Sequence, residues 1–352
     1  MPATQSAKRI GFFVLTMINV SAVVSIRNVA IMAQYGTSII LYMALAALMF
    51  FIPVALVSAE LSTTWPKLGG VYDWVDRAFG APWGFVAGWL LWVQNVIWFP
   101  ATLAFVATTF SYAWNPSLGQ NSIYALIAIL IGIWGTTLVN LFGIRASSWV
   151  STGGLIIGTL APILGIIVLA ISSPSTNIQD VSVSSVPDIT THPSLRIQVS
   201  YLLAIILAIS GMEMSAVHAR DVKSPQRTYA RAILASGIIV MTVYVGAALA
   251  VASLVPREIL GLTEGVMQAF SRGLEITSHQ AFIPFLAISI TIGGLAMINT
   301  WTAGPVKTLL ASADNGELPE YWQYLNRHGA PARLLLMQAV LASLAAMVFL
   351  LL

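Results

Sequence analysis

The stretch Val199 to Arg231, VSYLLAIILAISGMEMSAVHARDVKSPQRTYAR, decides the fold of this chain and its expected site. It begins as an apolar helix, LLAIILAI, that is long enough for about half of a bilayer. A serine, a glycine and the carboxylate of Glu213 follow near the middle of the hydrophobic span. A charged side chain at that depth costs roughly 2.5–3.5 kcal/mol on insertion scales. We therefore predict that the helix breaks at Gly211 and lines a polar cavity.

The composition indicates a helical membrane protein. Of the 352 residues, 58% are hydrophobic and only 8% are charged, whereas soluble domains carry about 25% charged residues. Cysteine is absent, which excludes disulfides, thiolate catalysis and cysteine-ligated metals. The four histidines lie far apart and lack metal-ligand spacing. We predict an all-α polytopic protein and expect no metal, no cofactor and no nucleic-acid partner.

Apolar runs predict about nine membrane spans. The first extends from Ile10 to Ala33 and carries small and polar residues in its middle. The other runs cover 38–59, 83–112, 123–142, 151–171, the opening stretch from 199, 229–255, 282–311 and 334–352. Pro53 is expected to kink the second span. The segment 60–82 contains Trp65-Pro66 and Gly69-Gly70 as breakers, so we expect it to be re-entrant or to lie on the membrane surface.

Lysine and arginine are distributed unevenly between the two sides of the predicted membrane. If the N-terminus is cytoplasmic, twelve of the sixteen basic residues fall on the cytoplasmic side, and the exceptions are Arg27, Arg196, Arg257 and Arg272. Cytoplasmic loops of membrane proteins carry such an excess. The pattern predicts a multi-pass protein of the plasma (inner) membrane with its N-terminus in the cytoplasm.

The first and sixth spans share an interruption near their middle. Because they lie five spans apart, they would belong to two units of opposite orientation. We expect a first repeat over 1–172, which includes the loop 60–82, an external loop over 173–198, and a second repeat over 199–352 that stops before a tenth span. Paired interrupted spans point to the binding site of a transporter, because free backbone N–H groups at a break can hold a carboxylate. The alternative is that the small residues only allow close helix packing.

Three segments resemble the amino acid–polyamine–organocation (APC) superfamily of transporters. They are GMEMSAVHARDVKSPQRTYARA on span six, AELSTTWPKLGGVYDWVDRAFGAPWGFVAGW after span two, and ASADNGELPEYWQYLNRHGAP after span eight. Within the superfamily, the residues SAVHARDVKSP are most similar to those of the glutamate:GABA antiporter family. The resemblance implies a LeuT-like inverted five-helix repeat, here with an incomplete second repeat. It also implies secondary active transport of amino acids, or exchange of amino acids for amines, by alternating access.

The resemblance also implies a set of site residues. In similar proteins the α-amino and α-carboxylate groups of the substrate lie at the breaks of helices one and six. The corresponding positions are Ser21, Ala22, Val23, Val24, Ser25, Ser210, Gly211 and Met212. Glu213 matches a pH-sensitive gate residue and Trp301 matches a tryptophan that packs on the substrate side chain. A purely structural carboxylate and an ordinary packing tryptophan are the alternatives.

Several positions depart from the pattern of the family. The usual G-S-G tract of helix one is replaced by Ala22-Val23-Val24, which should restrict unwinding, and an expected aromatic gate residue is Leu207. Arg27 could attract an anionic substrate group, pair with an acid or snorkel to the interface. Lys307 could mimic a bound cation or snorkel to the cytoplasmic side.

The missing tenth span leaves a second interpretation open, in which the chain is a truncated, non-transporting fragment or a substrate sensor. An enzyme is disfavoured, because the sequence contains no histidine–acid cluster, G-x-S-x-G elbow or phosphate-binding loop. The expected partners are a small amino acid or amine and the lipid bilayer. Proton coupling and a homodimer remain open.

Overall fold

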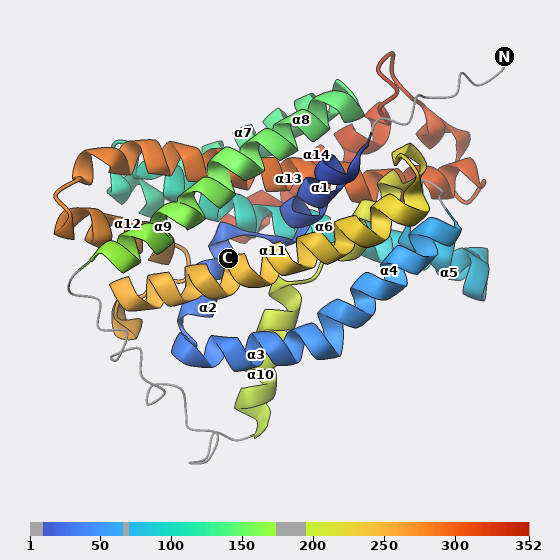
Figure 1. Cartoon of the computed structure of the whole chain (residues 1–352). Coiled ribbons are helices and arrows are strands. Elements are labelled where there is room, and N and C mark those ends of the chain that lie inside the picture. Colours follow the sequence, from blue (N-terminus) through green and yellow to red (C-terminus); the bar gives the residue numbers. More distant parts are fainter. Residues whose placement is uncertain (1–9, 66–69, 174–194, 352) are drawn as a thin grey trace.

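The computed structural model describes residues 10–65, 70–173 and 195–351 (Figure 1). Every regular secondary-structure element assigned within these ranges is a helix. Eight of them are long and apolar enough to cross a membrane, and the bent pair α1 (Phe12–Val23) and α2 (Ile26–Ala33) adds a ninth if it counts as one span. The predicted all-α polytopic architecture with about nine spans is therefore confirmed.

The remaining helices follow the predicted order closely. They are α3 (Ile39–Ala46), α4 (Ile52–Thr64), α5 (Val71–Phe79), α6 (Ala81–Ser111), α7 (Ser122–Leu141), α8 (Ile144–Leu155), α9 (Ala161–Ser172), α10 (Leu195–Ala208), α11 (Pro225–Leu254), α12 (Gly265–Ile276), α13 (Ile283–Asp314) and α14 (Ala332–Leu351). The segment expected at the membrane surface, 60–82, contains the end of α4 and the short α5. The loop expected over 173–198 lies almost entirely outside the described residues.

Two prolines follow wide helical turns. A π turn over Ala47–Phe51 precedes Pro53, and another over Ile156–Leu160 precedes Pro162. Proline has no N–H to donate and its ring clashes with the preceding turn, so a wider turn accommodates it inside a continuous span. The irregularity expected at Pro53 thus precedes the proline, and a second one occurs where none was predicted.

The centre of the molecule is built from α6 and α13, which pack against each other along their length. The helix α11 packs against both α1 and α2, and Figure 1 shows it as a long diagonal helix between α9 and the α3–α4 span. The turn after α8 approaches α13 at Gly158 and Gly293, where a Cβ on either residue would meet the other backbone. Small residues allow such close contact between membrane helices.

The first break lies between α1 and α2, which meet at an angle of 51°. Val24 (φ −76°, ψ 111°) and Ser25 (φ −116°, ψ 122°) are both extended. We expected Ala22-Val23-Val24 to restrict unwinding, and this expectation was wrong for a physical reason. The break requires only extended backbone, which β-branched residues adopt readily, so no glycine is needed.

The second break is of a different kind. The helix α10 ends at Ala208, and Gly211 (φ 121°, ψ 0°) leads into the 3₁₀ helix η6 (Met212–Asp221). A positive φ of this size is open to glycine and strained for other residues. A Cβ at Gly211 would lie 3.0 Å from the carbonyl oxygen of Ala22 and 3.0 Å from Cζ2 of Trp301. The two breaks are therefore in contact with each other.

Candidate substrate site between the helix breaks

A cavity of about 330 Å³ lies between the two breaks, and we call it the break cavity. Its walls come from α1, α2, α6, α10 and α13 and include Ala22, Val23, Arg27, Asn95, Ser210 and Trp301. The volume falls in the range of about 300–1,000 Å³ that holds small-molecule ligands. Mostly apolar walls with a few polar groups are typical of such sites.

The predicted site residues divide into two groups. Those that line the break cavity are Ala22, Val23, Ser210, Trp301 and Arg27. Ser21, Val24, Ser25, Gly211, Met212 and Glu213 lie around the cavity without lining it. Ser21 points to the other side of α1, where its Oγ lies 3.1 Å from Oγ1 of Thr300. Met212 is buried in the core.

Tyr244 on α11 joins the two breaks and was missed by the sequence analysis. Its buried hydroxyl donates to the carbonyl of Val23 (2.7 Å) and accepts from the N–H of Ser25 (2.9 Å). The carbonyl of Ala208, at the end of α10, lies 3.3 Å from the same oxygen. One hydroxyl thus satisfies backbone groups that the unwinding of the first span leaves without helical partners. A tyrosine in an otherwise apolar span was the available signal, because a buried tyrosine hydroxyl needs a polar partner.

Trp301 forms one end of the break cavity. Its indole Nε1 donates to the carbonyl of Ala22 (3.0 Å), and its own carbonyl accepts from Nδ2 of Asn95 (2.8 Å). The ring of Trp98 lies 5.8 Å from it, centroid to centroid. The aromatic face and the exposed backbone of the first break therefore meet at this end of the cavity.

Glu213 lies at the start of η6 and outside the lining of the break cavity. Its carboxylate interacts with the backbone N–H groups of Gly211 and of Glu213 itself. The Oε2 atom is enclosed and has no hydrogen-bond partner among the described residues. The carboxylate thus lies beside the first N–H groups of the second break, while one of its oxygens stays unpaired.

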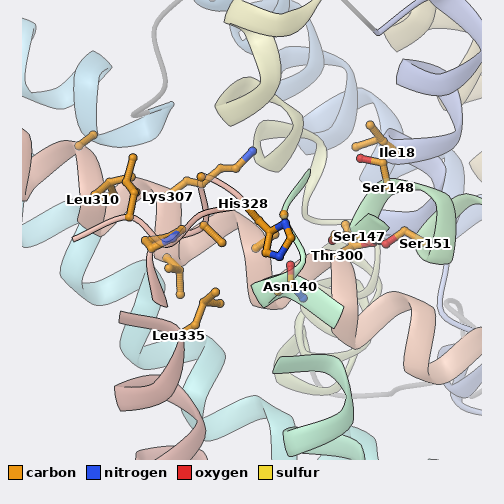
Figure 2. Close-up of a pocket in the computed structure, with 18 of the residues that line it drawn as sticks. Ile18, Asn140, Ser147, Ser148, Ser151, Thr300, Lys307, Leu310, His328 and Leu335 are labelled. Carbon is orange, nitrogen blue, oxygen red and sulfur yellow. Dashed lines mark hydrogen bonds between the residues drawn. The ribbon is translucent and has the colours of Figure 1, made fainter. Parts of the chain in front are cut away.

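A second cavity, of about 220 Å³, lies beyond the first break and is shown in Figure 2. We call it the loop cavity. It is lined by residues that include Ile18, Ser151, Thr300, Lys307 and His328. Asn326 fixes the loop that carries His328, since its Oδ1 accepts from the N–H groups of residues 328 and 330 (2.9 and 3.0 Å). Because Lys307 is part of this lining, it borders the loop cavity.

A thin partition separates the two cavities. Thr300 lines the loop cavity, whereas its neighbour Trp301 lines the break cavity. Oγ1 of Thr300 lies 3.1 Å from Oγ of Ser21 and donates to Oγ of Ser151 (2.8 Å). Asn299 extends this network, because its Nδ2 also donates to Ser151 (2.8 Å). The partition is formed by α1 and α13, which contribute residues to both cavities, and Ser151 of α8 supports it through hydrogen bonds.

The part of the chain that the structure describes contains no group of three or more histidine, aspartate or glutamate side chains that could hold a metal ion. The chemistry of the break cavity is therefore carried by backbone groups, aromatic faces, amides and one guanidinium group.

Comparisons with known proteins agree with this architecture. The sequence pattern of the family described as "Amino acid permease" matches residues 10–352. An uncharacterized transporter of Legionella pneumophila is 40% identical, over 99% of this chain and 75% of its own length. A glutamate/gamma-aminobutyrate antiporter of Lactococcus lactis subsp. cremoris is 28% identical over 95% of this chain and 67% of its own length. A probable agmatine/putrescine antiporter of L. lactis subsp. lactis is 25% identical over 82% of this chain and 61% of its own length.

The fold has also been seen in a solved structure. The crystal structure of MhsT in complex with L-phenylalanine superposes with a TM-score of 0.67 and 14% sequence identity, covering 95% of this chain and 78% of that one. This likeness concerns the fold and confirms the predicted LeuT-like architecture. The family pattern covers nearly the whole chain, and the chain belongs to the amino acid permease family, within the APC superfamily of membrane transporters.

Proposed function

We propose that this permease is a secondary active transporter that moves amino acids or related amines by alternating access, with the substrate bound in the break cavity. The observation that carries the proposal is the presence of one cavity on each side of a single partition. Alternating access requires that one central site be reached from the two sides in turn. Rearrangement of the Ser21–Thr300 and Ala22–Trp301 contacts would transfer access from the break cavity to the loop cavity.

The names of two relatives suggest the mode of transport. One is an antiporter for glutamate and gamma-aminobutyrate, and the other is a probable antiporter for agmatine and putrescine. We propose that this chain is likewise an antiporter, which exchanges an amino acid for the product of its decarboxylation, as in the glutamate/gamma-aminobutyrate pair. The sequence further supports a division into repeats over 1–172 and 199–352, and the distribution of basic residues supports an inner-membrane protein with a cytoplasmic N-terminus.

Counterflow into proteoliposomes tests the proposal. Purified protein is reconstituted with unlabelled glutamate, gamma-aminobutyrate, agmatine, putrescine or neutral amino acids inside, and uptake of each labelled compound is followed. Exchange of at least one pair above protein-free liposomes is expected. Ligand-induced thermal stabilisation without any counterflow would instead indicate a substrate sensor, and neither stabilisation nor counterflow across the panel would contradict both functions.

Glu213 is our candidate for proton coupling. Its enclosed Oε2 has no partner among the described residues, while its other contacts are to the backbone at the second break. Protonation there would weaken the attraction between the carboxylate and these backbone N–H groups and so couple a proton to the conformation of the break. Glu213→Gln keeps the shape of the side chain, and it is expected to flatten the pH dependence of exchange.

Glu275→Gln is the matched control, because Glu275 is an exposed carboxylate on α12. It should keep the wild-type pH profile. A wild-type profile in Glu213→Gln as well would remove Glu213 from the coupling step and leave it as a structural carboxylate.

A further inference from the structure

The break cavity contains an unbalanced positive charge. Arg27 is the one charged residue among the described residues that line it. The side chain is partly buried, and its Nη1 donates to Oγ1 of Thr102 at 3.5 Å, which is a long hydrogen bond. No carboxylate of the described residues forms an ion pair with it. A charge inside a membrane protein that lacks a counter-ion among the described residues is costly and marks a functional position.

The position of Arg27 contradicts simple snorkelling. The residue lies in the first turn of α2, directly after the break, and its guanidinium group contacts α6 rather than leaving the helix bundle. Thr102, Trp98 and Asn95 are spaced by four and three residues and therefore share one face of α6. That face forms one wall of the break cavity, and Arg27 lies toward its Thr102 end.

The other end of the same wall carries an unpaired acceptor. Asn95 is 2% exposed, its Nδ2 donates to the carbonyl of Trp301 (2.8 Å), and its Oδ1 has no partner among the described residues. A buried acceptor without a partner is costly, so a ligand that donates a hydrogen bond to it gains affinity. An ammonium group fits this end, because it can donate a hydrogen bond to the unpaired Oδ1 of Asn95.

The wall therefore has a cation, Arg27, at one end and an acceptor, Asn95, at the other, and the helix sets the distance between the two ends. Asn95 and Thr102 are seven residues apart on one helix, which places their Cα atoms about 10 Å apart. The side chains of Arg27 and Asn95 take up part of this distance, so the space left between the guanidinium group and the amide is shorter. A ligand that carries an ammonium group and a carboxylate a few carbon atoms apart matches this wall, because its ammonium group meets Asn95 and its carboxylate meets Arg27. A diamine would place a second positive charge beside the guanidinium group and be repelled.

We propose that Arg27 is the selectivity residue of the break cavity: it binds the distal carboxylate of the substrate, while Asn95 accepts a hydrogen bond from the ammonium group. The assignment rests on the proposed function, because it takes the break cavity as the substrate site. It predicts that glutamate and ω-amino acids such as gamma-aminobutyrate are carried and that putrescine and agmatine are excluded.

The test compares glutamate with glutamine, which has the same shape and lacks the distal charge. Arg27→Gln should raise the KM for glutamate about tenfold or more, with less than a threefold change for glutamine. Arg27→Lys keeps the charge and loses the bidentate geometry, so the KM for glutamate should rise severalfold. Arg27→Glu should allow putrescine to compete with the remaining uptake. Arg272→Gln, on the exposed side of α12 and outside the cavity, is the matched control with unchanged KM values.

The outcomes separate the two proposals. An equal change in KM for glutamate and glutamine in Arg27→Gln, or efficient exchange of putrescine by the wild type, would overturn the role of Arg27 while transport itself stands. Absence of all counterflow by the wild type would overturn the proposed function, and stabilisation of the detergent-purified protein by glutamate would then still test Arg27. If Arg27→Gln is not recovered as a monodisperse protein, Arg27→Lys decides: a wild-type ratio of glutamate to glutamine KM would overturn the assignment.

Discussion

The two helix breaks that enclose the cavity are built on opposite principles. The first consists of two extended residues, Val24 and Ser25, and side chains from other spans satisfy its backbone groups. The second depends on one residue, Gly211, whose positive φ and tight packing leave no space for a side chain. One break is thus specified by long-range hydrogen bonds and the other by local backbone conformation.

This difference shows where each break can be perturbed. A local break fails when its own residue changes, whereas a break supported from outside fails when its distant partners change. The first is therefore expected to tolerate substitution within its own sequence better than the second. Three substitutions test this contrast and a fourth tests a contact beside the first broken span; we describe them from the largest expected effect to the smallest.

The largest effect is expected for Gly211→Val. A β-branched residue at φ 121° is strongly strained, by about 1–3 kcal/mol for the backbone alone, and its Cβ would press on Ala22 and Trp301. Transport should be lost and the melting temperature should fall. Gly135→Val on α7 is the matched control, since a Cβ there meets no atom within 4 Å. Normal transport by Gly211→Val would mean that the second break does not depend on glycine.

The next effect is expected for Tyr244→Phe. The hydroxyl serves Val23 and Ser25, and its removal leaves a buried carbonyl and a buried N–H unpaired, at a cost of about 2–4 kcal/mol in total. Thermal unfolding and counterflow measure the loss. Tyr124→Phe, which removes one hydroxyl contact to a backbone carbonyl outside the breaks, should cost about 1 kcal/mol. Equal costs for the two substitutions would refute the view that the first break is held from outside.

Val24→Ala should have a smaller effect. The residue is 1% exposed, so the substitution removes buried methyl groups at a cost of about 1–2 kcal/mol, while alanine still adopts extended backbone. Counterflow should continue at a reduced rate. A loss of transport as complete as that of Gly211→Val would show that the sequence of the first break is as restrictive as that of the second.

The smallest effect concerns the start of α12, a helix that packs against α2 of the first broken span. Tyr112, directly after α6, lies near Glu264, directly before α12. Its pKa is raised to about 12, first by burial and second by Glu264. Because the pKa in the folded state lies above the unfolded value of about 10, this contribution to stability is complete below pH 10 and is lost as the pH rises through 12. Tyr112→Phe should therefore weaken the decline of the melting temperature in this window. An unchanged decline would exclude Tyr112 as its source.

The sequence indicated much of the fold and one half of the site. Span positions follow from long apolar runs, and Gly211 was visible because a glycine beside a carboxylate is conspicuous in a membrane helix. The first break was misjudged at Val24, because its conformation depends on partners more than two hundred residues away in the chain. Tyr244 and Asn95 could not be assigned for the same reason: in sequence they are isolated polar residues, and only the packing of α6 and α11 gives them roles. The family pattern supplied Trp301, which periodicity alone could not separate from ten other tryptophans.

The partition has a thermodynamic consequence. Adjacent residues of an α-helix point about 100° apart, so the turn of α13 that carries Thr300 and Trp301 forms a wall of both cavities at once. A ligand that displaces this turn from one side changes the volume on the other side. Linkage then requires that occupancy of either cavity alter the affinity of the other by the same factor. A solute that binds in the loop cavity and displaces this turn is therefore expected to change the affinity of the break cavity.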